Sequence, residues 1–195
     1  MNATAKRWER VRSHTRTCII EAAAQAFEAS GYEETCMHRI AETAGYTKAT
    51  IYAHYRDKAR LFAAVMDLHA SGFPVLVVPS LSGFGLKEAL AHVALEIQKL
   101  AQVNACRRFC GTLRRSASGV GFYAELWNAY LAPCRTYIGL AMTREEIDMA
   151  DEHARLYLQL LQQANGLQVT PLAATSADAT LSLFRRAFHG QCSRD

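Results

Sequence analysis

The chain has 195 residues and a formal net charge of +4, with 50% of its residues hydrophobic and 21% charged. This length accommodates one core, or a small head joined to a larger body, and excludes several independent domains. The composition excludes wholesale disorder, and no apolar run approaches the roughly 18 residues that are needed to cross a bilayer. The basic N-terminus has no apolar run behind it, so we expect no secretory signal, no membrane partner and a cytoplasmic location.

Residues 1–16 form a basic N-terminal arm. Five cations stand there against Glu9 alone, a local excess of four positive charges: Lys6, Arg7, Arg10, Arg12 and Arg16. Such an arm attracts polyanions, because a cation that neutralises a phosphate releases a condensed counterion. The alternative is a disordered, solubilising tail, which is common for a run of charge.

Two helices are predicted next. The segment CIIEAAAQAF, from Cys18 to Phe27, repeats apolar residues on one helical face that includes Ile20, and Gly31 supplies a stop. A short second helix follows with Thr35 as its expected N-cap. It ends at Gly45, where a tight turn is expected.

Thr47 is the expected N-cap of a third helix, KATIYAHY, which places Ile51 and Tyr55 on one face. Small and polar side chains occupy its opposite face. Asp57 is the expected N-cap of a fourth helix that continues to about residue 70. We therefore predict an N-terminal domain over residues 17–70.

The segment 71–85 is rich in Gly, Ser and Pro and is predicted to be an extended connector. The remainder reads as helical, so we predict a larger body over residues 71–195. Its expected helices cover residues 85–103, 105–118, 120–141, 144–165 and 176–189. A capping box of Thr143 and Glu146 is expected to start the fourth of these, and Pro133 is expected to kink the third.

Two short helices around a tight turn, the second with small residues outward, form a unit that fits the DNA major groove. Lys48, Tyr52 and His54 flank the outward face and suit phosphates, and the Thr50 hydroxyl suits a base edge or a phosphate. The alternative is an ordinary three-helix core, because short helices around a Gly turn occur in many all-α proteins.

The segment from Thr17 to Met66 resembles the N-terminal domain of TetR-family regulators. The similarity is carried by spaced features: Ala23 and Phe27, Gly31-Tyr32, Thr35, Ile40-Ala41, Ala44-Gly45, the run Lys48 to Tyr55, Lys58 and Leu61-Phe62. This resemblance implies an all-α homodimer, with a three-helix helix-turn-helix head that binds double-stranded DNA and a larger helical body for ligand binding and dimerisation.

Transferred position by position, the resemblance also implies where the DNA contacts lie. They are Thr35, Cys36, Met37, Thr47, Lys48, Ala49, Thr50, Tyr52, Ala53, His54 and Lys58. Tyr52 and Lys58 are implied to clamp the DNA backbone. The expected function is transcriptional regulation, as a repressor that a small-molecule effector releases from a palindromic operator.

Aromatic residues in the body are the candidates for effector binding. They are Phe109, Tyr123, Trp127, Tyr130 and Tyr137, on two inward-facing stripes. An aromatic stripe is typical of a plain core, but several Tyr and Trp on one face need polar partners, which favours a partly apolar cavity. Both interpretations stay open at this stage.

Apolar faces near the C-terminus are too broad to leave in water, and the family resemblance implies that they pair with a second copy as a dimer interface. They comprise Leu156, Leu160, Leu161, Leu181, Phe184 and Phe188. The cysteines are expected to be reduced core residues; Cys106 and Cys110, one turn apart, leave a metal or redox pair as the alternative.

Another class of function is a helical small-molecule-binding protein, or an enzyme, that does not bind DNA. His92, His153 or a cysteine would then be the catalyst. The sequence has no H-E-x-x-H, glycine-rich phosphate loop or G-x-S-x-G motif, so we expect no enzyme, no cofactor and no metal.

Overall fold

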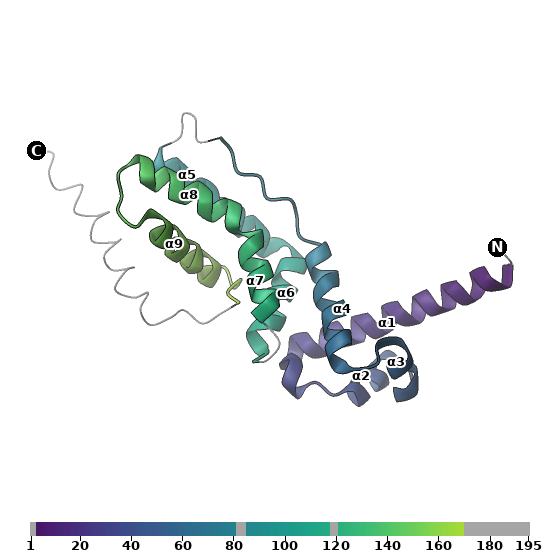
Figure 1. Cartoon of the computed structure of the whole chain (residues 1–195). Helices are drawn as coiled ribbons and strands as arrows, with labels where there is room; N and C mark the ends of the chain where they lie inside the picture. The colour runs from purple at the N-terminus through teal and green to yellow at the C-terminus, as the bar shows by residue number, and fades with distance from the viewer. Residues whose placement is uncertain (1–2, 81–84, 118–120, 170–195) are drawn as a thin grey trace, which may run out of the picture. The chain divides into compact units, whose positions relative to one another are not determined.

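A computed structural model describes residues 3–80, 85–117 and 121–169. Over these residues the chain forms helices and no strands (Figure 1), which confirms the predicted all-α class. The helix predicted over 176–189, the apolar residues Leu181, Phe184 and Phe188 in it, and Cys192 lie outside the described residues.

Contacts divide the chain into two compact units. The first contains residues 1–73 and 108–123, and the second contains residues 74–107 and 124–195. The first unit thus includes the predicted head and also a later segment, which sequence reading assigned to the body. Helices α6 and α7 each contribute residues to both units.

The first helix, α1 (Ala3–Glu34), includes most of the basic arm, which is therefore helical from Ala3. Its buried face contains Ile19, Ala23 and Phe27, whereas Ile20, predicted to face the core, is half-buried. Gly31 interrupts the helix with φ of 74°. A Cβ atom at Gly31 would lie 2.0 Å from the Arg115 carbonyl oxygen, so this position requires glycine for space as well as for its backbone angle.

Helices α2 (Met37–Ala44), α3 (Lys48–Tyr55) and α4 (Lys58–Ser71) complete the N-terminal bundle. The predicted caps of α3 and α4 are confirmed, because Thr47 Oγ1 accepts from Thr50 N at 3.2 Å and Asp57 Oδ1 accepts from Arg60 N at 2.8 Å. The predicted cap of α2 is wrong. Cys36 is the N-cap, since the Thr35 hydroxyl is turned back toward α1.

The C-terminal segment of the first unit lies against the end of α1. The last turn of α6 (Asn104–Arg115) leads into Ser116, whose Oγ accepts from the backbone N–H of Tyr32 at 3.0 Å. The backbone N–H of Ala117 donates to Glu33 Oε2 at 3.0 Å. These bonds join segments that are 84 residues apart in the sequence, so the end of α1 is held by the segment that follows α6.

The second unit contains α5 (Leu86–Gln102), α8 (Ala132–Arg144) and α9 (Ala150–Ala164), which pack together. Residues 73–80 form neither helix nor strand, which agrees with the connector predicted over 71–85, although Ser71 still belongs to α4 and residues 81–84 lie outside the described part of the chain. The helix predicted over 120–141 is divided at Leu131, just before Pro133, into α7 (Gly121–Tyr130) and α8.

The capping box predicted at Thr143 and Glu146 is wrong. Thr143 lies inside α8, where its hydroxyl donates to the Gly139 carbonyl at 2.9 Å. Glu146 lies in the turn between the two helices with a positive φ of 57°, and α9 begins only at Ala150. The predicted stop at Asn165 and Gly166 is confirmed, because Asn165 is the C-cap of α9.

Replacing Gly31 with alanine should destabilise the fold more than the same change at Gly45. Both glycines have positive φ, of 74° and 72°, but a Cβ at Gly45 would meet nothing within 4 Å. We expect the free energy of unfolding to fall by about 1 kcal/mol in Gly45→Ala, and by about 3 kcal/mol in Gly31→Ala because a backbone carbonyl must also move. Urea denaturation of both variants measures the difference, and equal losses would contradict the close contact with Arg115.

Acid should destabilise the protein partly through His69, which is buried in the first unit. Burial, with a smaller effect of Arg108, lowers the pKa of His69 from 6.5 to about 4. The unfolded chain therefore binds this proton more tightly, so stability is lost as pH falls from about 6.5 to about 4. Protonation of His69 over this whole interval lowers the free energy of unfolding by about 3 kcal/mol. In His69→Gln the unfolding free energy should fall less over this interval; identical pH profiles would contradict the assignment.

Candidate DNA-binding site

The helix-turn-helix is formed by α2, a turn at Gly45 to Thr47, and α3. Gly45 adopts a left-handed conformation, with φ of 72° and ψ of 27°, and its N–H bonds to carbonyls of the last turn of α2. The Tyr46 N–H also donates to the Ala41 carbonyl, at 3.0 Å. This turn ends α2 sharply and sets the direction of α3.

Helix α3 has one buried face and one exposed face. Ile51 is 0% exposed and Tyr55 is 6% exposed, as their predicted shared face requires. The predicted DNA contacts on α3 and its cap lie away from this face: Thr47, Lys48, Ala49, Tyr52 and Ala53 are exposed, and Thr50 and His54 are half-buried. The small side chains of Ala49 and Ala53 leave the backbone of the exposed face accessible.

Two pairs of side chains on the exposed face of α3 and its cap contact each other. The Thr50 and Thr47 hydroxyls lie 2.9 Å apart, within hydrogen-bonding distance. The Lys48 ammonium lies 5.7 Å from the centre of the Tyr52 ring, where a cation–π interaction holds both side chains at the surface.

The predicted contacts around the start of α2 have different environments. Cys36 is exposed, and the backbone N–H groups of His38 and then Arg39 lower the pKa of its thiol. Met37 and Thr35 are both 6% exposed. The Thr35 hydroxyl lies 2.6 Å from the Gly31 carbonyl, and Lys58 is half-buried with its ammonium among backbone carbonyls.

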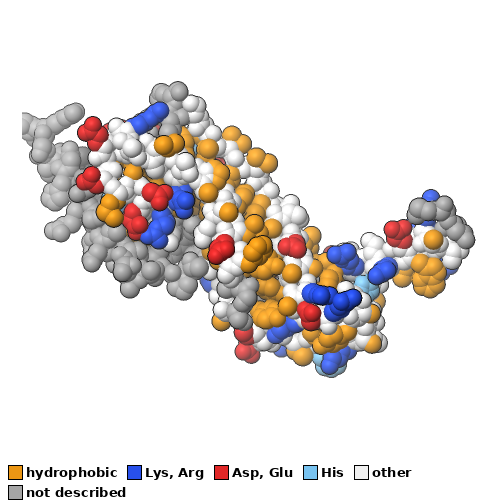
Figure 2. Space-filling view, in the orientation of Figure 1, with side chains coloured by type: hydrophobic (Ala, Val, Ile, Leu, Met, Phe, Trp, Pro, Cys, Tyr) orange, Lys and Arg blue, Asp and Glu red, His pale blue; other side chains and the backbone are white. Residues whose placement is uncertain are grey.

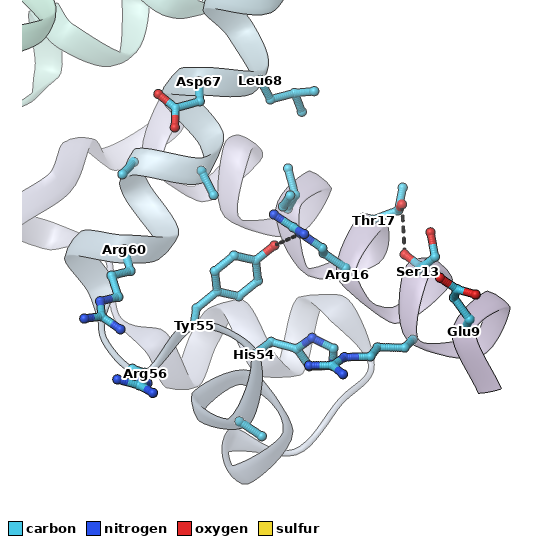
Figure 3. Close-up of a pocket in the computed structure, with 15 residues that line it drawn as sticks. Glu9, Ser13, Arg16, Thr17, His54, Tyr55, Arg56, Arg60, Asp67 and Leu68 are labelled. Atoms are coloured by element: carbon cyan, nitrogen blue, oxygen red, sulfur yellow. Dashed lines mark hydrogen bonds between the residues drawn. The ribbon is translucent and has the colours of Figure 1, made fainter. Parts of the chain in front are cut away.

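A groove of about 960 Å³ lies beside α3 in the first unit. Figure 3 shows Arg16 pointing toward the Tyr55 hydroxyl, with Arg56 and Arg60 farther along the groove. Arg16 Nε donates to the Tyr55 hydroxyl at 3.3 Å, and burial raises the pKa of Tyr55 although this Arg opposes the shift. Lys and Arg side chains gather on the visible face of this region (Figure 2).

Arg56 and Arg60 were not singled out from the sequence. The sequence could have indicated them, because both are cations that closely follow a helix whose exposed face was a candidate DNA surface. Arg56 also has a positive φ of 47°, which is uncommon for a residue other than glycine. Arg12 and Arg16, one helical turn apart on α1, line the same groove, so the basic arm and α3 share one polar surface.

The predicted effector residues fall into two groups. Phe109 and Tyr123 belong to the first unit, where their ring centres lie 6.2 Å apart and each also contacts another aromatic ring. Trp127, Tyr130 and Tyr137 belong to the second unit. Trp127 Nε1 donates to Gln162 Oε1 at 2.8 Å, and the Tyr130 hydroxyl donates to the Pro74 carbonyl at 2.8 Å.

Tyr137 is the predicted effector residue that lines an open apolar groove of about 570 Å³ in the second unit. Pro79, Pro133, Thr136 and Leu140 also line it. The Tyr137 hydroxyl is buried and has no hydrogen-bond partner among the described residues.

The buried cysteines behave as core residues. Cys106, Cys110 and Cys134 are each 0% exposed, and burial raises the pKa values of Cys106 and Cys134 to about 11. Such thiols carry little thiolate at neutral pH. Over the described residues no group of three or more His, Cys, Asp or Glu is placed to hold a metal ion.

In the described part of the chain, no helix combines the length and the apolar character that crossing a membrane requires.

Comparison with known proteins identifies the region that contains the helix-turn-helix. Residues 19–65 match the profile of a family described as bacterial regulatory proteins, tetR family. The chain is 30% identical over 95 residues to the HTH-type transcriptional regulator AcrR of Shigella flexneri, a match that covers 46% of this chain and 44% of that protein. It is 31% identical over 80 residues to the HTH-type transcriptional repressor AcnR of Corynebacterium diphtheriae, with 41% and 42% covered.

The chain thus spans less than half the length of these curated relatives. A longer structural match exists to a TetR family transcriptional regulator from Pseudomonas syringae pv. tomato, with a TM-score of 0.53, 22% identity, and 90% of this chain and 95% of that chain covered. This match supports the fold. Residues 19–65 thus match the tetR family of bacterial regulatory proteins, and over the rest of the chain the comparison supports the fold alone.

Proposed function

We propose that the protein is a transcriptional regulator, and specifically a repressor, that binds a palindromic operator as a homodimer and is released by a small-molecule effector. The observation that carries the proposal is the exposed face of α3, which follows a tight turn and presents small and polar side chains. Repression is the proposed sign because AcnR, a relative, is named a repressor.

The proposed DNA contacts divide by role. Lys48 and Tyr52 are exposed and adjacent, which suits phosphate oxygens, and the groove with Arg16 and Arg56 extends the same basic surface. Thr50, in the first turn of α3, is the proposed base-reading residue. The exposed Cys36 and the backbone N–H groups at the start of α2 are proposed to meet the DNA backbone.

Dimerisation is proposed because two α3 helices about one duplex turn apart would read a palindrome. Of the apolar residues predicted for the interface, Leu156 is buried within the protomer, whereas Leu160 and Leu161 on α9 are half-buried and therefore available to a second copy.

The effector is proposed to bind in the second unit at the groove beside Tyr137. Its mostly apolar lining suits an apolar molecule, and the hydroxyl of Thr136 provides a polar group in the groove. An effector lowers DNA affinity by the ratio of its affinities for the DNA-free and DNA-bound conformations.

Selection from random duplex DNA with the purified protein tests the function. We expect enrichment of a palindromic site that a dimer binds, with an affinity that falls steeply as salt rises because phosphate contacts release counterions. The mass in solution gives the oligomeric state. A folded protein that enriches no sequence at low salt would overturn the proposal.

Two substitutions on α3 should separate positioning from base reading. Lys48→Met should weaken binding to every sequence alike and reduce the slope of log affinity against log salt by about 0.9, the value for one phosphate contact. Thr50→Ala should instead change the preferred base at one position of each half-site, by about tenfold. The check is a salt titration and a repeated selection with each variant; an unchanged preference in Thr50→Ala would remove it from the base-reading role.

A further inference from the structure

The Lys58 ammonium is surrounded by backbone oxygens. Lys58 Nζ donates to the carbonyls of Tyr32, Glu33 and Thr35 at 2.8, 3.2 and 3.1 Å. An ammonium has three N–H donors and no acceptor, so these bonds use all of its hydrogens. The charge also lies 4.5 Å from the centre of the Tyr32 ring.

The three carbonyls belong to the end of α1 and to the link before α2. Carbonyls at a helix C-terminus lack helical partners and carry the negative end of the helix dipole, so a cation there is stabilising. The Thr35 hydroxyl contacts the Gly31 carbonyl, at 2.6 Å, in the same segment. Because Lys58 is the first residue of α4, it ties the start of α4 to the end of α1 and to the start of α2.

We propose that Lys58 is a positioning residue: it fixes the start of α2 for DNA binding and does not itself contact the DNA. This differs from the phosphate clamp that the family resemblance implies. Its effect on affinity rests on the proposed function, whereas its hold on the carbonyls is a property of the protein alone.

Lys48 provides a matched comparison. It is the first residue of α3, as Lys58 is of α4, but its ammonium is at the surface and faces the ring of Tyr52 instead of carbonyls. A phosphate can therefore approach Lys48 directly. To bind a phosphate, Lys58 would have to give up at least one of its three carbonyls, two of which it reaches through part-buried hydrogen bonds, and a desolvated carbonyl that loses its partner is costly.

Amine labelling of the wild-type protein, read by mass spectrometry, tests whether the carbonyls hold the Lys58 ammonium, without any substitution. We expect Lys58 to react at least tenfold more slowly than Lys48 in the free protein, and its rate to stay the same when operator DNA is added. Lys48 should become protected only with DNA. Fast labelling of Lys58 in the free protein followed by protection on DNA would overturn the proposal. If DNA protects neither lysine but Lys58 still reacts slowly, the hold of the carbonyls on Lys58 is supported and the proposed DNA binding is contradicted.

Variants of Lys58 that keep or remove its charge test the positioning role. Arginine has a planar fork that does not direct three N–H groups at these carbonyls, but it binds phosphate well. We expect Lys58→Arg and Lys58→Met to lower affinity alike, by about tenfold for every sequence, with an unchanged salt slope. Lys48→Arg should retain wild-type affinity. Wild-type affinity in Lys58→Arg, or a salt slope reduced by about 0.9 in Lys58→Met, would show a phosphate contact instead.

Discussion

The end of α1 is the constraint on which the first unit depends. At Gly31 the backbone turns to a positive φ while the Arg115 carbonyl occupies the space of a side chain. Other segments bond to polar groups near this interruption: Ser116 Oγ accepts from the Tyr32 N–H, Glu33 Oε2 accepts from the Ala117 N–H, and Lys58 donates to the terminal carbonyls. A helix end buried without partners would cost several hydrogen bonds, so these contacts determine where α2 begins.

The position of α2 in turn determines that of α3. Gly45 permits a left-handed turn at the end of α2, and the Thr47 cap starts α3 three residues later. Burial of Ile51 and Tyr55 then fixes the rotation of α3 about its own axis. The turn, the cap and the two buried side chains thus determine which face of α3 is exposed. The exposed residues themselves need make no contact for this.

The parts of this fold that could be predicted from sequence are those that local chemistry decides. Thr47 and Asp57 cap their helices as expected. Each side chain accepts from the backbone N–H three residues later, which has no carbonyl partner within its helix. Thr35 was predicted by the same rule and is not a cap, because its hydroxyl finds a carbonyl of α1 that the sequence gives no means to foresee. The predicted DNA and effector contacts stay predictions, although the split of the aromatic residues between two units depends on long-range packing that periodicity does not report.

The composition of the exposed α3 face limits how it can read a sequence. Ala49 and Ala53 have no hydrogen-bonding side chain, and the Thr50 hydroxyl is already within bonding distance of Thr47. Methyl groups of alanine and threonine pack well against the thymine methyl in the major groove, whereas bidentate recognition of guanine needs an arginine or lysine. On the proposed function, base selection by α3 would therefore rest largely on apolar contact and shape, and affinity would rest on the surrounding cations, so a single hydroxyl at Thr50 would carry much of the hydrogen-bonded readout.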